Sequence, residues 1–368
     1  MKELPLSSSV LIVGAGAHVP YKFPTSQQLT NLIKKIYKDR TRITIINRNI
    51  NGNSEQSSVL RYKHELCTIA RTLGIIKPSE RPASPNDYDI RLGSSLDEFL
   101  KSFCESQVYS IDSYLSQISG NKSDEHLLIK SDWGRLLVAY LISQHERQMP
   151  FGTQEFDWIQ FLIDRYIKNN LQSFFKSPPK IITFNYDRYL ERCIFKHLTE
   201  FHRKSEQEAK VLVDSLPILH VYGRLGCYTK WDVSDEREFF LEAKNNIQVI
   251  GENRSQSSLD DTSTTIRQWI GTSDCQKVYF LGYGFDSLNN SLLMKGLPTD
   301  WHAFVEVFTT NVGLKESDKS FIIKNLGFQP KYISGNRQHS EVHTINLLKE
   351  LEPLEKPKTI PQRAGNIN

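Results

Sequence analysis

Four short segments of this chain carry the glycine, amide, carboxylate and imidazole groups that nucleotide chemistry uses. Each segment follows a run of apolar residues with the composition of a buried strand. In an open parallel sheet the carboxyl ends of the strands line one crevice, and ligands bind there. The four segments therefore predict one ligand site, built from Gly14–Ala17, Thr183–Asp187, His220–Gly223 and Gly282–Asp286.

The first glycine segment suits the binding of phosphate. Glycines directly after a strand let backbone N–H groups approach a pyrophosphate, so we expect Gly14, Ala15, Gly16 and Ala17 to contact a cofactor. A Rossmann dehydrogenase would need a third glycine, a helix that starts at once and an acidic residue about 20 positions on. Here the predicted helix begins only at Thr25. The nearest candidate strand, residues 43–46, is followed by Asn47-Arg48 and not by an acidic residue. The sequence therefore disfavours a redox enzyme.

The polar residues of the second and third segments have both a structural and a chemical interpretation. Asn185 and Asp187 stand where a strand gives way to a helix, so an Asx turn capped by Asp187 would explain them. Asn185 can also donate and accept hydrogen bonds at once. His220 is the candidate general base, because its charge changes near neutral pH, although a core histidine at a strand end is the alternative.

The four segments can meet only if a sheet aligns the strands before them, and the sequence pattern after residue 178 predicts such a sheet. Strand and helix signals alternate at short spacing there, which predicts βα units and a parallel sheet. Upstream, Thr25 and Gln28 have the spacing of a capping box for a helix through about Lys38. We expect strands after the first one near 180–184, 216–221, 247–250, 277–282, 303–309 and 329–333.

A mostly helical pattern separates the first strand from the second. We expect a helical insertion over about 60–175 that packs on the sheet, with one helix face formed by Trp133, Leu136, Leu137, Tyr140 and Leu141. The predicted fold class is α/β, a Rossmann-like parallel sheet with helices on both faces and this insertion. Residues 1–350 are expected to form one domain, and the tail 352–368 to be disordered.

Composition narrows the classes of function. The 368 residues are 24% charged, 39% hydrophobic and 11% aromatic, which is typical of a soluble globular protein. The net charge is +4 with Lys and Arg scattered, so composition makes no case for direct nucleic-acid binding. The longest apolar stretch, residues 136–142, is far shorter than the ~20 residues of a membrane span. We expect no membrane partner.

Cysteine spacing bears on metals and on the compartment. The five cysteines include no CxxC pair, and their number is odd. This pattern disfavours a zinc ribbon and a disulfide framework and is typical of the reducing cytoplasm. We therefore expect a cytoplasmic protein without a bound metal.

The order of the four segments resembles the sirtuins, which carry GAG, TQN-I-D and HG motifs and a glycine-containing nucleotide-contact segment. The chain looks more like the zinc-free, sirtuin-like NAD hydrolases of bacterial antiphage defence. Their first motif runs into a Pro-Ser/Thr stretch and a helix, as Phe23–Leu29 does here, and they often carry an acidic helix start such as Ser95–Leu100. The chain departs from deacylating sirtuins because it lacks their four zinc cysteines.

The resemblance implies roles for individual residues. Asn185 would hold a ribose hydroxyl or the attacking water while the nicotinamide–ribose bond breaks through an oxocarbenium-like state, as in glycoside hydrolysis. Asp187 would fix the ribose hydroxyls or the loop. The adenosine side would contact Gly282, Tyr283, Gly284 and Asp286, where a glycine turn capped by Asp286 is the structural alternative. Thr183 and Gly223 complete the predicted cofactor contacts.

The third motif matches the family imperfectly. The family histidine directly precedes its glycine, whereas Tyr222 precedes Gly223 here and His220 lies two residues earlier in the chain. Residues 220 and 222 of a strand point to the same side. Three possibilities follow: His220 is the base, Tyr222 replaces it, or the site binds NAD without hydrolysing it well. We prefer the first.

The resemblance implies an NAD+ glycohydrolase that depletes NAD+ during abortive infection, with NAD+ as substrate. Control is expected from homo-oligomerisation and from a co-encoded defence partner of an ATPase or helicase-like, Argonaute-like or nucleotide-sensing kind. One alternative is an NAD-dependent protein deacylase. Another is a non-catalytic regulatory subunit that binds NAD or ADP-ribose.

Overall fold

A six-stranded parallel sheet forms the centre of the protein, with strand order β3-β2-β1-β4-β5-β6. This order is that of the doubly wound Rossmann fold, so the predicted α/β class is confirmed. The strands are β1 (Ser9–Val13), β2 (Lys180–Thr183), β3 (Ile218–His220), β4 (Lys277–Leu281), β5 (Glu306–Thr309) and β6 (Lys331–Tyr332). The computed structural model describes residues 8–46, 65–71, 73, 85–118, 124–148, 157–168, 170–229, 236–248, 256–272, 274–295, 297, 301–303, 305–310, 320, 324, 326 and 331–332.

The register brings the strand ends level with one another. Val13, the last residue of β1, pairs with Thr183 on one side and with Leu281 on the other. Thr183 pairs in turn with His220. All five residues of β1 are buried, as expected for a central parallel strand that is covered on both faces. The segments that follow β1, β2, β3 and β4 therefore leave the same edge of the sheet.

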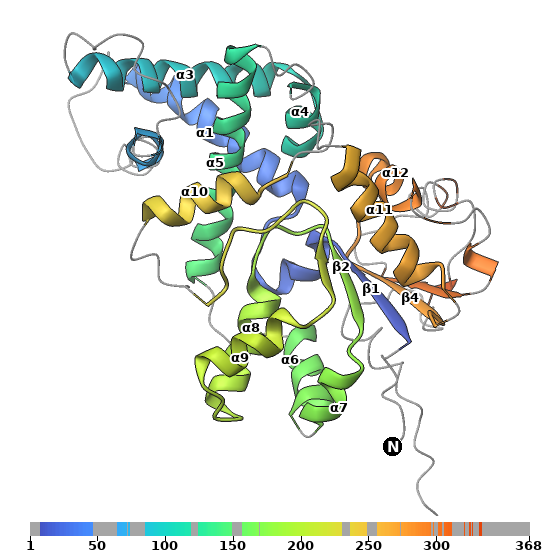
Figure 1. Ribbon diagram of the computed structural model, residues 1–368. Coiled ribbons are helices and arrows are strands. Elements are labelled where there is room, and N and C mark those ends of the chain that lie inside the picture. The colour runs from blue at the N-terminus through green and yellow to red at the C-terminus, as the bar shows by residue number, and fades with distance from the viewer. Residues whose placement is uncertain are drawn as a thin grey trace, which may run out of the picture.

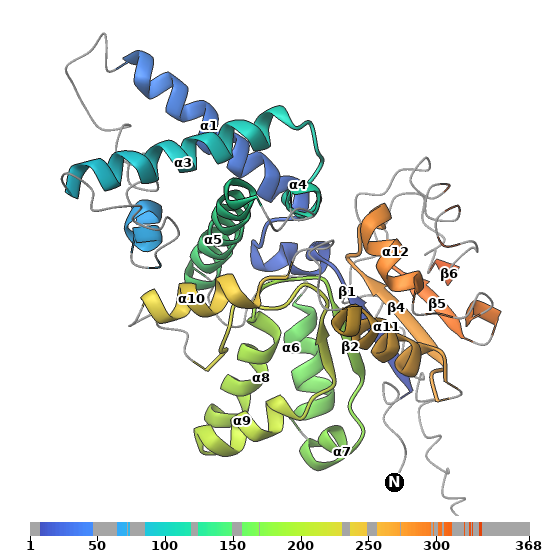
Figure 2. The same cartoon turned by 45° about the horizontal axis from the view of Figure 1, so that its top comes forward.

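Helices flank both faces of the sheet. The chain moves from β1 outward to β3 and then returns to β4, and right-handed crossovers place the later helices on the opposite face. In Figures 1 and 2, α6 and α8 lie on one side of the strands and α11 lies on the other. These flanking helices are α6 (Trp158–Leu162), the π-helical turn Ile163–Ile167, α7 (Leu171–Lys176), α8 (Tyr189–Glu200), α9 (Glu206–Asp214), α11 (Gln256–Ile270) and α12 (Ser287–Lys295).

A third group of helices stands over the carboxyl edge of the sheet (Figure 1, top). It contains α1 (Ser26–Ile46), α3 (Pro85–Glu105), α4 (Ile111–Ile118), α5 (Glu125–Gln148) and α10 (Glu236–Asn246), and helical residues at 65–71. The 3₁₀ helix Ala15–Tyr21 connects β1 to this layer. The helix face predicted on α5 is buried at all five positions. The helical insertion thus roofs the edge at which the four segments meet.

The capping box at the start of α1 is present. The backbone N–H of Gln28 donates to Thr25 Oγ1 at 3.2 Å, and that of Thr25 donates to Gln28 Oε1 at 2.8 Å. The helix runs on to Ile46, so the candidate strand at 43–46 was wrong. Ser95–Leu100 lies inside α3, which begins at Pro85, so the predicted helix start at Ser95 was also wrong.

One predicted strand is absent where it can be checked. Residues 247–248 follow α10 as irregular chain, and residues 249–250 lie outside the described part. The N–H of Gln248 donates to the carbonyl of Tyr222 at 2.9 Å, so this backbone is paired with a loop and not with the sheet. The predicted tail at 352–368 also lies outside the described residues.

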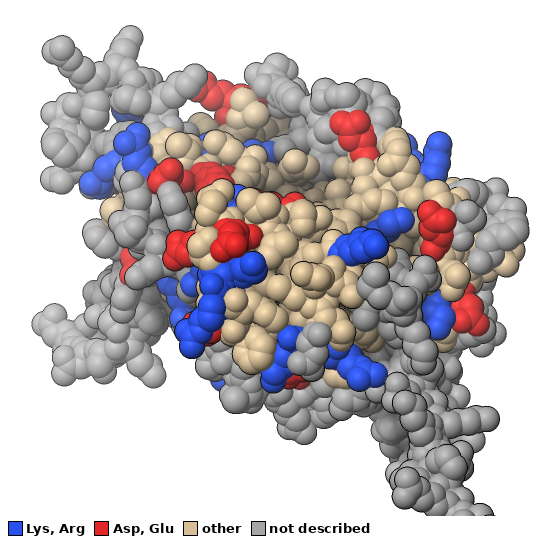
Figure 3. Space-filling model, turned by 60° about the horizontal axis from the view of Figure 1, so that its bottom comes forward, with Lys and Arg blue, Asp and Glu red and all other residues tan. Residues whose placement is uncertain are grey.

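The described surface mixes charges of both signs. Figure 3 shows one face on which Lys and Arg side chains are interspersed with Asp, Glu and uncharged residues. Within the described ranges, no helix has both the length and the apolar character required to cross a membrane.

Candidate functional site

A cavity of about 800 Å³ lies at the carboxyl edge of the sheet, within the size range of small-molecule sites. Its floor is formed by the segments after β1, β2, β3, β4 and β5. Its other walls are formed by residues between 18 and 29, which lead into α1, and by residues of α4, of the loop before α4 and of α5. It also lies where the strand order reverses between β1 and β4, which is where this class of sheet binds ligands. Lining residues include Gly14–Gly16, Phe184–Asp187, Tyr222, Gly282–Gly284, Asp286 and Thr310.

The two glycine segments pack directly on each other. The N–H of Gly14 donates to Leu281 O and that of Gly16 to Gly282 O, both at 2.9 Å. A Cβ on Gly14 or Gly16 would lie 2.6 or 2.7 Å from the Gly282 carbonyl oxygen. Both glycines are therefore needed for this close approach, whatever binds above them.

This packing changes the role predicted for the first segment. The N–H groups of Gly14, Gly16 and Ala17 all donate to backbone carbonyls, so they do not form a free phosphate nest. Ala17 lies behind the cavity wall, where its carbonyl accepts the Trp158 indole N–H at 2.9 Å. Gly14, Ala15 and Gly16 line the cavity and offer a close, flat backbone surface to a ligand.

The second glycine segment has one packed and one open glycine. Gly282 has a φ of 56°, and a Cβ there would lie 1.8 Å from the Ala17 nitrogen, so only glycine fits. A Cβ on Gly284 would meet no atom within 4 Å. Gly284 lines the cavity, so packing does not explain its small size, while close approach of a ligand would.

Asn185 is held by its backbone and by one side of its amide. Its N–H donates to Thr183 Oγ1 at 3.1 Å, and its Nδ2 donates to the Gly14 carbonyl at 3.3 Å. The Oδ1 atom is buried and has no partner in the described part of the chain. Thr183 itself does not line the cavity, so its role is to position Asn185 and not to contact a cofactor directly.

His18 lines the cavity and is not among the site residues predicted from the sequence. Its Nδ1 lies 2.9 Å from Asp187 Oδ2, and because a carboxylate accepts, Nδ1 carries the proton. Nε2 is buried without a partner among the described residues, and in the neutral ring it is the acceptor. The rings of Tyr21, Phe23 and Trp158 surround the imidazole at centroid distances of 5.7 to 5.9 Å.

Asp187 links this histidine to the start of α8. Its Oδ2 pairs with His18, and its Oδ1 accepts the N–H of Tyr189 at 3.0 Å. The predicted Asx turn is thus present, and Asp187 lines the cavity, but the predicted cap was wrong because Arg188 occupies the N-cap position of α8. The only advance signal for His18 was its position directly after the Gly14–Ala17 segment.

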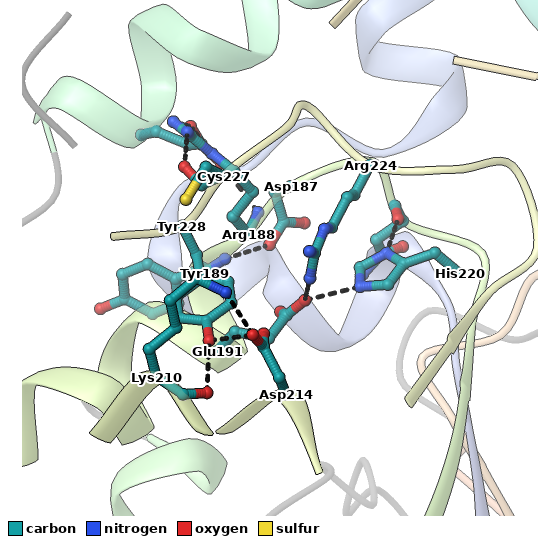
Figure 4. A network of polar contacts seen from close by, with 12 residues as sticks. Asp187, Arg188, Tyr189, Glu191, Lys210, Asp214, His220, Arg224, Cys227 and Tyr228 are labelled. Carbon is teal, nitrogen blue, oxygen red and sulfur yellow. Dashed lines mark hydrogen bonds and ion pairs between the residues drawn. The ribbon is translucent and has the colours of Figure 1, made fainter. Parts of the chain in front are cut away.

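His220 does not line the cavity, which corrects the expected reach of this residue into the site. Its Nε2 lies 2.7 Å from Glu191 Oε1, and its Nδ1 lies 3.3 Å from the Asn185 carbonyl. Arg224 Nη1 donates to the same Glu191 oxygen at 3.2 Å. Figure 4 shows the histidine and the arginine converging on that carboxylate.

The contacts of His220 make it a cation. Both ring nitrogens face acceptors, so both are donors. Burial disfavours the imidazolium, but the charge and hydrogen bond of Glu191 outweigh it and raise the pKa of His220. Burial likewise opposes ionisation of Glu191, yet His220 and Arg224 lower its pKa to about 2. A protonated, ion-paired histidine cannot accept a proton.

Tyr222 lines the cavity, but its neighbour Gly223 does not. The Tyr222 hydroxyl donates to Asn289 Oδ1, and its ring packs against Phe184 and Tyr186. Gly223 has a φ of 73°, and a Cβ there would lie 1.8 Å from the Asn246 carbonyl oxygen. The turn alone therefore explains why this position is glycine.

A buried ion pair holds the turn after Asp187 to the roof. Arg188 Nη2 lies 2.6 Å from Glu146 Oε2 on α5, and the Arg188 N–H donates to Glu146 Oε1 at 2.8 Å. Arg188 Nη1 also donates to the Cys227 carbonyl at 2.6 Å. These bonds fix Asn185 and Asp187 relative to the helical layer.

The cavity wall is acidic. Asp112, Asp187 and Asp286 line it, and no Lys or Arg of the described ranges does. The Tyr186 hydroxyl donates to Asp112 at the start of α4. Burial raises the pKa of Asp112, and the charge of Asp286 adds to that effect against the hydrogen bond from Tyr186.

Comparison of the chain with protein-family models, curated proteins and solved structures found no match.

Proposed function

We propose that this protein is an NAD+ glycohydrolase, which cleaves NAD+ with water to nicotinamide and ADP-ribose. One observation carries the proposal: Asn185, His18 and Asp187 meet in one cavity, where Asn185 Oδ1 and His18 Nε2 are buried and unpartnered within the described residues. Buried polar atoms nearly always have partners in folded proteins. A ligand that supplies hydroxyl groups or water would satisfy both.

The position and size of the cavity suit a dinucleotide. It lies at the switch point of a sheet with the order β3-β2-β1-β4-β5-β6 and has a volume of about 800 Å³. The close glycine surfaces of Gly14, Gly16 and Gly284 would let a ligand backbone approach the floor. These features support a nucleotide ligand without choosing its chemistry.

The polar groups support hydrolysis of an N-glycosidic bond. Asn185 would hold a ribose hydroxyl or the attacking water. As that water's oxygen bonds to C1′, its proton passes to His18 Nε2, while Asp187 keeps Nδ1 protonated and the ring oriented. The C1′–nitrogen bond breaks with its electron pair going to nicotinamide, which leaves neutral. The released proton then passes from His18 to solvent.

The charge of the wall supports the same step. The nicotinamide ring of NAD+ is cationic, and its ribose becomes oxocarbenium-like as the bond breaks. The carboxylates of Asp187 and Asp286 line the cavity beside Asp112. Negative groups placed where positive charge develops lower the barrier.

The biological role that we propose follows from the resemblance to zinc-free, sirtuin-like defence proteins. Depletion of NAD+ would act as the toxic output of an antiphage system in the cytoplasm. NAD+ hydrolysis must be switched off before infection, so we propose control by a co-encoded partner and by homo-oligomerisation.

The test is release of nicotinamide from NAD+ by the purified protein, with and without its genomic neighbour and an acyl-lysine peptide. We expect release that needs no peptide and that Asn185→Ala abolishes, while the exposed control Asn245→Ala retains it. Circular dichroism and thermal unfolding of both variants would confirm an intact fold.

Other outcomes assign other functions. Release only with the peptide would make the protein a deacylase. Saturable binding of NAD+ or ADP-ribose without turnover, with every partner tested, would make it a regulatory subunit. Normal turnover by Asn185→Ala would remove this residue from the mechanism.

A further inference from the structure

The rim of the cavity carries an aromatic ring that nothing in the described protein covers. Tyr109 lies in the loop between α3 and α4 and lines the cavity, yet it is 83% exposed. The next most exposed large apolar residue in the described ranges, Val211, is 59% exposed. Leaving a large ring this open costs hydrophobic stabilisation that burial would provide. A ring at a cavity mouth recovers that stabilisation when a ligand covers it.

The loop that carries Tyr109 is fixed at both ends. The Ser106 hydroxyl donates to the Phe103 carbonyl at 2.7 Å and ends α3. On the other side, the Ser113 N–H donates to Ser110 Oγ at 3.1 Å and begins α4. The exposed ring thus lies on a short loop with a side-chain hydrogen bond at each end.

The same loop contains backbone strain. Gln107 has a φ of 56°, a left-handed conformation that costs a residue other than glycine roughly 1–2 kcal/mol. Strain of this kind persists where the surrounding structure requires it and is concentrated at binding sites. Here it turns the chain between α3 and α4 immediately before Tyr109.

The loop is also tied to the floor of the cavity. Asp112, in the first turn of α4, accepts the hydroxyl of Tyr186, which follows β2. Figure 2 shows the connection from α3 to α4 at the same side of the molecule as the carboxyl ends of the strands. Tyr109 therefore has a set position relative to Asn185 and Asp187 at the buried end.

We infer that Tyr109 is the stacking platform for the adenine base of the dinucleotide, an inference that rests on the proposed function. The reacting bond must lie beside His18 and Asn185, which are 3% and 6% exposed. The other end of an extended dinucleotide then lies toward the open rim, where the ring stands. A tyrosine presents a rigid flat face to a base, and such stacking is independent of hydrogen-bond pattern.

The experiment measures binding and turnover separately. Isothermal titration would give Kd values for ADP-ribose, which contains adenine, and for nicotinamide mononucleotide, which lacks it. The variants are Tyr109→Ala, Tyr109→Trp and the control Phe201→Ala, an exposed aromatic residue that does not line the cavity. Nicotinamide release from NAD+ by the same proteins would give KM and kcat.

We expect Tyr109→Ala to weaken ADP-ribose binding by about 5- to 100-fold, with nicotinamide mononucleotide changed less than about twofold. Tyr109→Trp should restore binding, and Phe201→Ala should leave it unchanged. In turnover, KM for NAD+ should rise while kcat stays within about threefold, because the ring stands at the exposed rim whereas His18 and Asn185 are buried.

Several results would overturn the inference. They are an unchanged Kd in Tyr109→Ala, an equal loss for both ligands, or no measurable binding of ADP-ribose to the wild type. Turnover with an unchanged KM in Tyr109→Ala would remove the subsite and leave the hydrolase standing. Adenine-dependent binding through Tyr109 without any turnover would do the reverse.

Discussion

Two histidine–carboxylate pairs flank the turn after β2, and only one of them lines the cavity. His18 faces the cavity, with Nδ1 on Asp187 and Nε2 without a partner in the described protein. His220 faces away from the cavity, with one nitrogen on Glu191 and the other on the Asn185 carbonyl. A general base needs a free nitrogen within reach of the reactant. Of the two pairs, only His18–Asp187 offers one.

The two histidines differ in their place, because one lines the cavity and the other supports residues that line it. His18 belongs to the cavity wall, where its Nε2 and the Oδ1 of Asn185 have no partner among the described residues. His220 belongs to the layer beneath it, where every charge has a partner and the cluster holds the Asn185 backbone to α8. Sequence motifs do not distinguish these layers, because both need polar residues next to strand ends.

The largest expected effect comes from replacing each histidine by an amide side chain. In His18→Asn the amide can still donate to Asp187, but the acceptor at Nε2 is lost. We expect kcat for nicotinamide release to fall by about 10²- to 10⁴-fold, the usual contribution of a general base. His220→Gln should lower it by less than about tenfold. An active His18→Asn protein with an inactive His220→Gln protein would exchange the two roles.

Gly282 and Gly284 differ in the same way, because Gly282 is packed against the backbone and Gly284 faces open space in the cavity. Gly282→Ala forces a side chain into a left-handed backbone and onto Ala17, so the free energy of unfolding should fall by about 3 kcal/mol or more. Gly284→Leu enters open space in the cavity and should leave stability within about 1 kcal/mol while it weakens NAD+ binding. Denaturant unfolding and titration of both variants check the pair. A destabilised Gly284→Leu protein would place Gly284 in the packed layer.

Local signals explain what the sequence predicted correctly. The buried run of β1, the capping box of Thr25 and Gln28, and the strand–turn–helix at Asn185 and Asp187 are each encoded within a few residues. The common crevice followed from a general rule about parallel sheets. Local sequence therefore predicts the fold class and much of the cavity floor.

Long-range contacts explain what the sequence did not predict. The partner of His18 lies 169 positions away, and Glu191, which keeps His220 charged, lies 29 positions from it. Neither pairing leaves a local pattern. The β-branched run at 43–46 favoured a strand, but it continues α1, and α1 packs against α3. A strand propensity over four residues is a weak signal, and the helix that begins at Ser26 continues through them.

The stability that the His220–Glu191 pair contributes should depend on pH. The pKa of His220 is raised above its usual 6.5, so its contribution to stability is complete below about pH 6.5 and is lost as pH rises through the folded pKa. The pKa of Glu191 falls from 4.5 to about 2, so its contribution is complete above about pH 4.5 and is lost as pH falls toward 2. The cluster should therefore stabilise most between about pH 4.5 and 6.5.

The measurement is the free energy of unfolding of wild type and His220→Gln in urea at pH 5.5 and pH 9. At pH 5.5 the variant should be less stable by about 1.5–3 kcal/mol, the usual range for hydrogen bonds to charged groups. At pH 9 the difference should shrink. An equal difference at both pH values would show that His220 is not held as a cation.

Tyr222 is the remaining candidate for the general base, and its substitution should have the smallest effect. Tyr222 lines the cavity, but its hydroxyl already donates to Asn289 and its ring packs between Phe184 and Tyr186. Tyr222→Phe keeps the ring and removes one hydrogen bond, which should cost about 1 kcal/mol of stability. Nicotinamide release should stay within about threefold of wild type, because His18 supplies the acceptor. Loss of turnover in this variant, with His18→Asn still active, would move the base to Tyr222, so that neither histidine pair would take part in the proton transfer.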